Sequence, residues 1–419
     1  MSSDWTRIAK NIAAGTLALR IGVVGVNFAV MMGLATVLGL EVFGQLAFLW
    51  GATLVAGTVL SLGGPLIILQ AVTNGGGMHR RQLMALAVVY PFAFAFLAYL
   101  ALSGLWPAMP WTAILCAGLG VNLLGCVASL MRGLGSVQGS MALRDAGPQC
   151  TLAGAALIVG EPDATAILLV SASLMGILAG HCGLWCLTRA SDGNAFSSDA
   201  RSSWSPALWA TSVFGMGVAQ MDLIIGGAFL PAEALGLYAL LRRIANLVAL
   251  PVSVATWISA GPISAAFGAG DMRQLEQASA AGSRIAMLPG TALFALGLAG
   301  LPLMSWVVVP DQISAAVGLF VILLLGALGQ VVVASSYTVA TLCGFARYSV
   351  LARGATLLAY VTFALALGDG LSPLSNALCA ICAITLGSFV LWALLKARLG
   401  LDTSAFILLR KPMPTWKTS

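Results

Sequence analysis

Residues 205–262 read SPALWATSVFGMGVAQMDLIIGGAFLPAEALGLYALLRRIANLVALPVSVATWISAGP, and this stretch decides the fold. It holds two apolar runs, 205–229 and 236–262, joined by a short turn that carries Pro231 and Glu233. A helix needs about 20 apolar residues to cross the hydrocarbon core of a bilayer. Each run is long enough to do so, and the turn between them predicts a hairpin of two membrane-spanning helices.

The same pattern fills the rest of the chain. Of the 419 residues, 60% are hydrophobic and 8% are charged, with a mean hydropathy of +0.99. Soluble domains carry about 25% charged residues, so soluble and disordered classes are excluded. The sequence predicts an all-α polytopic membrane protein with about twelve spans, at 13–38, 44–70, 83–104, 110–130, 146–160, 164–187, 205–229, 236–262, 284–309, 313–341, 350–368 and 374–395.

The positions of the basic residues predict the orientation of the chain. With the N-terminus in the cytoplasm, 17 of the 20 basic residues lie in the inside segments, at the cytoplasmic ends of the spans or in the C-terminal tail, and the outside loops hold none. Cytoplasmic loops are enriched in Lys and Arg, so we expect both termini to lie inside. The net charge of +6 then reflects this topology, and no nucleic-acid partner is expected.

Composition also predicts how the chain is divided. The segment 191–204 is rich in Ser, Asp and Gly, as cytoplasmic linkers are. It separates an N-terminal six-helix lobe at 1–190 from a C-terminal six-helix lobe at 205–397. A basic cytoplasmic tail at 398–419 follows the second lobe.

A short repeat suggests that the two lobes are related. E-x-x-G-x-x-A occurs as Glu41, Gly44 and Ala47 and again at Glu233, Gly236 and Ala239, with an offset of 192 residues. Each copy lies at the outside turn between the first two helices of its lobe. This placement predicts a parallel repeat about a pseudo-two-fold axis along the membrane normal, which is a known transporter layout.

Sequence signals of catalysis and metal binding are missing. The chain has two histidines and no G-x-S-x-G or Walker motif, and its eight cysteines lie within or beside apolar runs. We therefore expect no catalytic residues, no metal site and no cofactor, and hence not an enzyme.

Polar residues inside the spans are the candidates for function, because such residues usually face a bundle interior or a water-filled cavity. Arg20 and Asn27 are two helical turns apart and share one face of the first span. In the eighth span, polar residues recur with the helical period and form a stripe along one face, which consists of Tyr238, Arg242, Asn246 and Ser253. Arg243 lies beside this stripe. We interpret these residues as cavity-lining, and snorkelling to the outer interface is the alternative for Arg242 and Arg243.

Asp222 in the seventh span shares a face with the small residues Gly215, Ala219 and Gly226, which is the face expected to pack against neighbouring helices. Two roles are open for its carboxylate. It is the structural partner of an arginine or a site that couples transport to H⁺ or Na⁺, and the third alternative is that it has neither role.

Several stretches resemble bacterial polysaccharide repeat-unit flippases, which belong to the multidrug/oligosaccharidyl-lipid/polysaccharide exporter superfamily. The resemblance is carried by residues 222–238, by LGLEVFGQLAF in the first lobe, by Pro251 and Pro262, and by Gly270-Asp271 with the LEQA segment that follows. The matches are scattered over most of the chain, and twelve spans fit the polysaccharide branch.

The resemblance implies a V-shaped pair of lobes around a central cavity, in the bacterial cytoplasmic (inner) membrane. It implies that the protein flips an undecaprenyl-pyrophosphate-linked glycan from the inner to the outer leaflet by alternating access. The glycan that is moved would serve the synthesis of O-antigen, exopolysaccharide or capsule. The expected partners are membrane lipids, a polysaccharide polymerase and glycosyltransferases. Arg20, Arg242 and Arg243 would meet the anionic head group. The alternative is a cation-coupled multidrug exporter of the same superfamily, which would favour acidic cavity residues.

Overall fold

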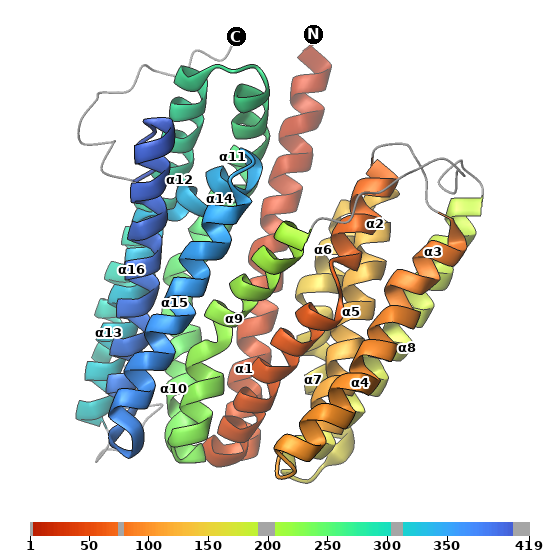
Figure 1. The fold of residues 1–419 in the computed structure, drawn as a ribbon, viewed down its shortest axis with the longest axis vertical. Coiled ribbons are helices and arrows are strands. Elements are labelled where there is room, and N and C mark those ends of the chain that lie inside the picture. Colours follow the sequence, from red (N-terminus) through yellow and green to blue (C-terminus); the bar gives the residue numbers. More distant parts are fainter. Residues whose placement is uncertain (1–2, 74–78, 192–205, 303–312, 405–419) are drawn as a thin grey trace. The chain divides into compact units, whose positions relative to one another are not determined.

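The computed structural model describes residues 3–73, 79–191, 206–302 and 313–404 (Figure 1). Almost all of the predicted linker 191–204 and residues 405–419 of the predicted tail lie outside these ranges. The described residues form helices and no strand. The helices are α1 (Ser3–Leu60), α2 (Gly64–Thr73), α3 (Arg80–Met84), the π-helix η1 (Ala85–Val89), α4 (Tyr90–Leu105), α5 (Trp111–Gly133), α6 (Val137–Asp145), α7 (Gly147–Val159), α8 (Ala164–Ser191), α9 (Pro206–Phe229), α10 (Ala232–Ala245), the 3₁₀ helix η2 (Asn246–Ala249), α11 (Leu250–Gly268), α12 (Met272–Ala299), α13 (Ile313–Val332), α14 (Ala334–Leu342), α15 (Ala346–Leu367), the 3₁₀ helix η5 (Gly368–Gly370) and α16 (Pro373–Leu399).

By length and composition, ten segments of the described residues are able to cross a membrane. The first of them, Leu19–Leu60, has 42 residues, which as one helix is about 63 Å long, twice the thickness of a bilayer core. Gly39, with φ 76°, breaks it into two arms. Figure 1 shows α1 running in one direction and then turning back. With these arms counted separately and the shorter apolar helix α7 included, every one of the twelve predicted spans has a helix.

Four of the predicted spans and boundaries were wrong. The predicted span 44–70 is interrupted at residues 61–63, between the end of α1 at Leu60 and the start of α2 at Gly64. The segment 263–283, which lies between two predicted spans, is largely helical, because α11 continues to Gly268 and α12 begins at Met272. Asp271 caps α12 by accepting a hydrogen bond from the backbone N–H of Gln274 at 3.0 Å. The predicted span 236–262 is not one helix, since α10 ends at Ala245 and α11 starts at Leu250. The predicted span 313–341 is interrupted between α13 and α14 at Val333.

The chain divides into two compact units. Unit 1 comprises Met1–Met216 with Ala232–Gly236, and unit 2 comprises Gly217–Pro231 with Leu237–Ser419. The boundary thus passes through α9 and α10, so the hairpin quoted above contributes to both units.

Unit 1 is built around α5, which is the most deeply buried of the candidate spans. α1, α2, α4, α6 and α8 all pack against it. The two copies of the sequence repeat also meet in this unit. A Cβ atom added to Gly44 would overlap the carbonyl oxygen of Ala232 and lie 2.7 Å from the backbone nitrogen of Gly236. Two helices therefore cross backbone against backbone at the repeated glycine, which explains why both copies have it.

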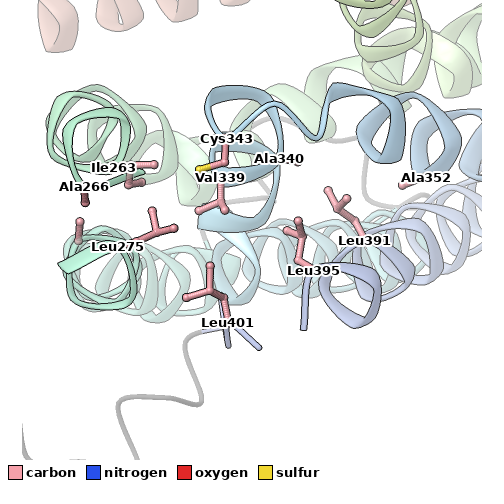
Figure 2. Packing of buried hydrophobic residues seen from close by; sticks show 11 residues of the cluster. Ile263, Ala266, Leu275, Val339, Ala340, Cys343, Ala352, Leu391, Leu395 and Leu401 are labelled. Carbon is pink, nitrogen blue, oxygen red and sulfur yellow. The ribbon is translucent and has the colours of Figure 1, made fainter. Parts of the chain in front are cut away.

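Unit 2 has an apolar cluster where α11, α12, α14, α15 and α16 converge (Figure 2). Leu275 of α12, Val339 of α14 and Leu391 of α16 are fully buried in it. Leu401, which follows the end of α16, packs against the same cluster. A second cluster joins α9, α15 and α16 around Met221 and Tyr360, and it surrounds the polar residues described next.

Candidate functional site

Asp222 on α9 is the centre of a polar network inside unit 2. Its side chain is 8% exposed, in a part of the helix that is otherwise apolar. The Oδ2 atom accepts a hydrogen bond from the hydroxyl of Tyr238 at 2.7 Å and forms an ion pair with Nε of Arg242 at 2.5 Å. The Oδ1 atom accepts a bond from the backbone N–H of Leu223 at 3.1 Å. These donors supply the cation and the hydrogen bonds that offset the loss of water around a buried carboxylate.

The two donors on α10 are placed by helical geometry. Tyr238 and Arg242 are four residues apart, so their side chains lie on one face and reach the same carboxylate. Arg242 also donates a hydrogen bond through Nη2 to the carbonyl oxygen of Ala219, one turn before Asp222 on α9. Arg242 therefore points inward and is held at two points, in place of snorkelling toward the membrane surface.

The network continues to two residues that the sequence analysis missed. Nδ2 of Asn376 on α16 donates a hydrogen bond to the backbone carbonyl of Asp222 at 3.1 Å, and the hydroxyl of Tyr360 on α15 donates to Oδ1 of Asn376. Both side chains are fully buried. They are polar groups inside predicted spans, so the rule that singled out Arg20 and Tyr238 would also have found them.

The small-residue face of α9 has the packing that was expected of it. A Cβ atom added to Gly226 would lie 2.8 Å from Nδ2 of Asn376, so this position lets α16 approach α9 closely. Because of that approach, the Asn376 amide reaches the backbone of Asp222.

The predicted stripe on the eighth span does not continue past Arg242. Pro251 has no N–H to donate to a preceding turn, and the helix changes to the 3₁₀ turn η2 just before it. Asn246 is exposed on this turn. The hydroxyl of Ser253 donates to the carbonyl of Leu250 at 2.8 Å, within its own helix α11. Tyr238 and Arg242 share a site, and the structure does not bring Asn246 or Ser253 into it.

Arg243 follows Arg242 on α10, is half-buried and lies within electrostatic range of it. Arg243 therefore places a second positive charge next to Arg242 on α10.

Arg20 and Asn27 lie in unit 1, on α1. Nδ2 of Asn27 donates a hydrogen bond to the carbonyl oxygen of Asp145, the last residue of α6, at 2.8 Å. Arg20 lies within electrostatic range of Asp145 and of its neighbour Arg144. The predicted candidates thus fall into two groups, Arg20 with Asn27 in unit 1, and Asp222 with Tyr238, Arg242 and Arg243 in unit 2.

No group of three or more His, Cys, Asp and Glu side chains that could hold a metal ion is present in the described residues.

Comparison with solved structures places the architecture among known transporters. An inward-facing multidrug resistance MATE family transporter of the MOP superfamily aligns with a TM-score of 0.61 at 12% identity, over 92% of this chain and 99% of that one. The MATE multidrug transporter DinF-BH, solved in complex with a ligand, aligns with a TM-score of 0.63 at 14% identity, over 95% of this chain and 96% of that one. The chain has the fold of the MATE transporters. At these identities the likeness concerns the fold alone.

A third similar structure is a MOP superfamily transporter from Pyrococcus furiosus, for which reverse polarity of the binding pocket suggests a different function. It aligns with a TM-score of 0.58 at 12% identity, over 95% of each chain. No protein-family model and no curated protein matches this sequence. The prediction of an all-α polytopic membrane protein with a two-lobe transporter fold is confirmed, and the polysaccharide branch of the superfamily stays a prediction.

Proposed function

We propose that this protein is a membrane transporter that moves a polyprenyl-pyrophosphate-linked oligosaccharide from the inner to the outer leaflet of the bacterial cytoplasmic membrane. The MATE-like fold and the ten membrane-crossing segments support a transporter. The fold is compatible with more than one substrate class, so the cargo is inferred from the charges of the polar residues inside the spans.

The observation that carries the choice of cargo is the pairing of Asp222 with Arg242. Asp222 is the only one of the 14 acidic residues of the sequence that falls within a predicted span. Arg242 lies 2.5 Å from it and offsets its charge, and Arg243 adds a second positive charge beside the pair. A site of this composition suits an anionic head group, since guanidinium groups bind phosphates through several parallel hydrogen bonds.

The second candidate is a cation-coupled multidrug exporter. It is favoured by the likeness to MATE transporters, among them the multidrug transporter DinF-BH. A cationic drug needs an acidic group that is free to pair with it, and the ion pair of Asp222 with Arg242 speaks against this class.

Purified protein in proteoliposomes tests the choice directly. We expect inward-to-outward movement of a fluorescent polyprenyl-pyrophosphate oligosaccharide and no accumulation of a cationic fluorescent dye. Arg243→Gln is the informative variant, since Arg243 lies outside the hydrogen-bonded network. Loss of one charge-assisted contact is worth about 1.5–3 kcal/mol, so its substrate affinity should fall about 10- to 150-fold.

Arg189→Gln is the matched control, because Arg189 at the end of α8 stacks on Trp185 and carries the same charge away from the network. It should transport like the wild type. Transport of the cationic dye with no movement of the lipid-linked sugar would overturn the proposal in favour of the multidrug exporter.

Coupling of this transport to H⁺ or Na⁺ is part of the same proposal, with Asp222 as the candidate group. Asp222→Asn should abolish the dependence on an ion gradient if the carboxylate exchanges Arg242 for a cation during the cycle. An unchanged gradient dependence would restrict Asp222 to its structural ion pair. A polysaccharide polymerase and glycosyltransferases are the partners that the proposed activity requires.

A further inference from the structure

Two helical hairpins of unit 2 carry the same kind of bond, in which a tyrosine hydroxyl donates to a side-chain oxygen of the other helix. In the hairpin of α9 and α10, Tyr238 donates to the carboxylate of Asp222 at 2.7 Å. In the hairpin of α15 and α16, Tyr360 donates to the amide oxygen of Asn376. An asparagine amide has nearly the shape of an aspartate carboxylate, but it is neutral and has two N–H donors. The second hairpin therefore offers donors where the first offers only acceptors.

The amide of Asn376 has one orientation that satisfies its partners. Its Oδ1 atom accepts a hydrogen bond from the hydroxyl of Tyr360, so Nδ2 is directed at the backbone carbonyl of Asp222, 3.1 Å away. The reversed amide would place Oδ1 against that carbonyl, and two acceptors cannot bond to each other. Both Asn376 and Tyr360 are fully buried, so water does not replace either bond. The hydroxyl of Tyr360 thus orients the donor that binds Asp222.

The amide binds α9 at the residue that carries the carboxylate. In an α-helix, the carbonyl of residue 222 points toward position 226, one turn further along. Position 226 is a glycine, and a Cβ atom there would lie 2.8 Å from Nδ2 of Asn376. Asn376 therefore fills the space that a side chain at position 226 would take, and it holds the backbone of α9 from the side of α16.

Arg242 holds α9 from the side of α10, one turn earlier. It donates to the carbonyl of Ala219 and pairs with the carboxylate of Asp222. The backbone of α9 is thus bound at two neighbouring turns, by Arg242 at Ala219 and by Asn376 at Asp222. A rotation of α9 that turns the carboxylate away from Arg242 would also break the bond from Asn376. Both contacts therefore select the same rotation of the helix.

We propose that Asn376, oriented by Tyr360, is a positioning residue for Asp222. Its amide keeps α9 at the rotation in which the carboxylate meets Arg242 and Tyr238. This role follows from the contacts within unit 2 and is independent of the transported cargo. If the pair of Asp222 and Arg242 opens during the proposed transport cycle, the same amide links that event to α15 and α16.

The first test measures how well the carboxylate of Asp222 is held. Dicyclohexylcarbodiimide is an apolar reagent that modifies carboxyl groups inside membrane proteins, and mass spectrometry of the purified full-length protein locates the modified residue. We expect slow modification of Asp222 in the wild type and severalfold faster modification in Asn376→Ala. Tyr360→Phe should act in the same direction, because it keeps the amide and removes only the hydroxyl that orients it.

Asn122→Ala is the matched control. Asn122 on α5 in unit 1 is also buried, and its Nδ2 donates to a backbone carbonyl of another helix, that of Ala87 in η1, at 3.2 Å. Its loss should reduce stability without changing the modification of Asp222. Modification of Asp222 at the wild-type rate in both Asn376→Ala and Tyr360→Phe, or equal acceleration in Asn122→Ala, would overturn the positioning role.

A double-mutant cycle on the free energy of unfolding is the second test. Arg242→Ala should destabilise the protein less in the Asn376→Ala background than in the wild type, because without the amide the carboxylate is already displaced from Arg242. In the Asn122→Ala background the loss should be undiminished. Additive losses for Asn376 and Arg242 would show that Asn376 only packs against α9, which would overturn the role. Neither test involves transport, so a failure of transport would count against the proposed function alone.

Discussion

Asp145 and Asp222 each form an ion pair with an arginine, and the two pairs differ in almost every other respect. The side chains of Asp145 and Arg144 are 28% and 50% exposed, at a helix end in unit 1. Those of Asp222 and Arg242 are 8% and 14% exposed, in the interior of unit 2. The first pair joins neighbours in the sequence, whereas the second joins two helices. The comparison shows that the same two residue types act as a replaceable surface contact in one unit and as part of the core in the other.

The physical reason is solvation. Water stabilises each partner of an exposed pair almost as well as the other partner does, so such pairs contribute about 0–1 kcal/mol. A buried charge that loses its partner has no water to replace it, and breaking such a pair costs about 3–5 kcal/mol. Variants of the two pairs should therefore differ severalfold in their effect on the free energy of unfolding.

The largest effect should come from Arg242→Ala, which leaves the carboxylate of Asp222 buried without its cation. We expect a loss of about 3–5 kcal/mol in the free energy of unfolding, measured by denaturant unfolding in detergent. The double variant Asp222→Leu with Arg242→Met removes both charges and should regain most of that loss. A double variant as unstable as Arg242→Ala would contradict the comparison.

Tyr238→Phe should have the next largest effect. It removes one hydrogen-bond donor to the Asp222 carboxylate and keeps the ion pair, so we expect a loss of about 1–3 kcal/mol. Tyr99→Phe is the matched control, because Tyr99 is 41% exposed on α4, and it should be nearly silent. Equal losses in the two variants would show that the buried hydroxyl contributes nothing specific.

Arg144→Ala should cost no more than about 1 kcal/mol, because its partner Asp145 stays accessible to water. The loss should shrink further in about 1 M salt, where the screening length is about 3 Å, whereas the loss in Arg242→Ala should persist. A salt-independent loss of the size expected for Arg242→Ala would remove the distinction between the two pairs.

Replacement of Asp402 should have the smallest effect on the stability of the fold, and that effect should depend on pH. It lies beyond the end of α16, where partial burial disfavours its charge. Hydrogen bonds from Ser404 and Trp392 and the nearby Lys396 outweigh that burial and hold the pKa of the Asp402 carboxyl below its ordinary value. A carboxyl with a lowered pKa stabilises the fold above its unfolded pKa of about 3.9, and this contribution is lost as the pH falls through the lower folded value.

Thermal unfolding of the wild type and Asp402→Asn measures this contribution, in a series from about pH 6 down to about pH 3 that spans the ordinary carboxyl pKa. The wild type should be the more stable of the two at the upper end, and the difference should shrink toward the lower end. A difference that grows on acidification would contradict the assigned direction.

Much of the fold could be predicted from the sequence, because a span must satisfy its own backbone hydrogen bonds within one helix. The apolar runs therefore mark the helices, even where a boundary such as the start of α12 was misplaced by a polar N-terminal turn. The site could be predicted only in part. Asp222, Tyr238 and Arg242 were recognised as polar groups inside spans, but Tyr360 and Asn376 were not.

The sequence by itself determined the number and approximate position of the helices. For Asp222 it indicated two candidate roles without deciding between them. Only the tertiary structure decided that Arg242 pairs with it, because that depends on how α9 and α10 are rotated about their axes. The same holds for the link to Asn376, which lies 154 residues from Asp222 in the chain. Hydrophobic patterning is a local property of the chain, whereas the partner of a buried charge is set by helix packing, and no local pattern records it.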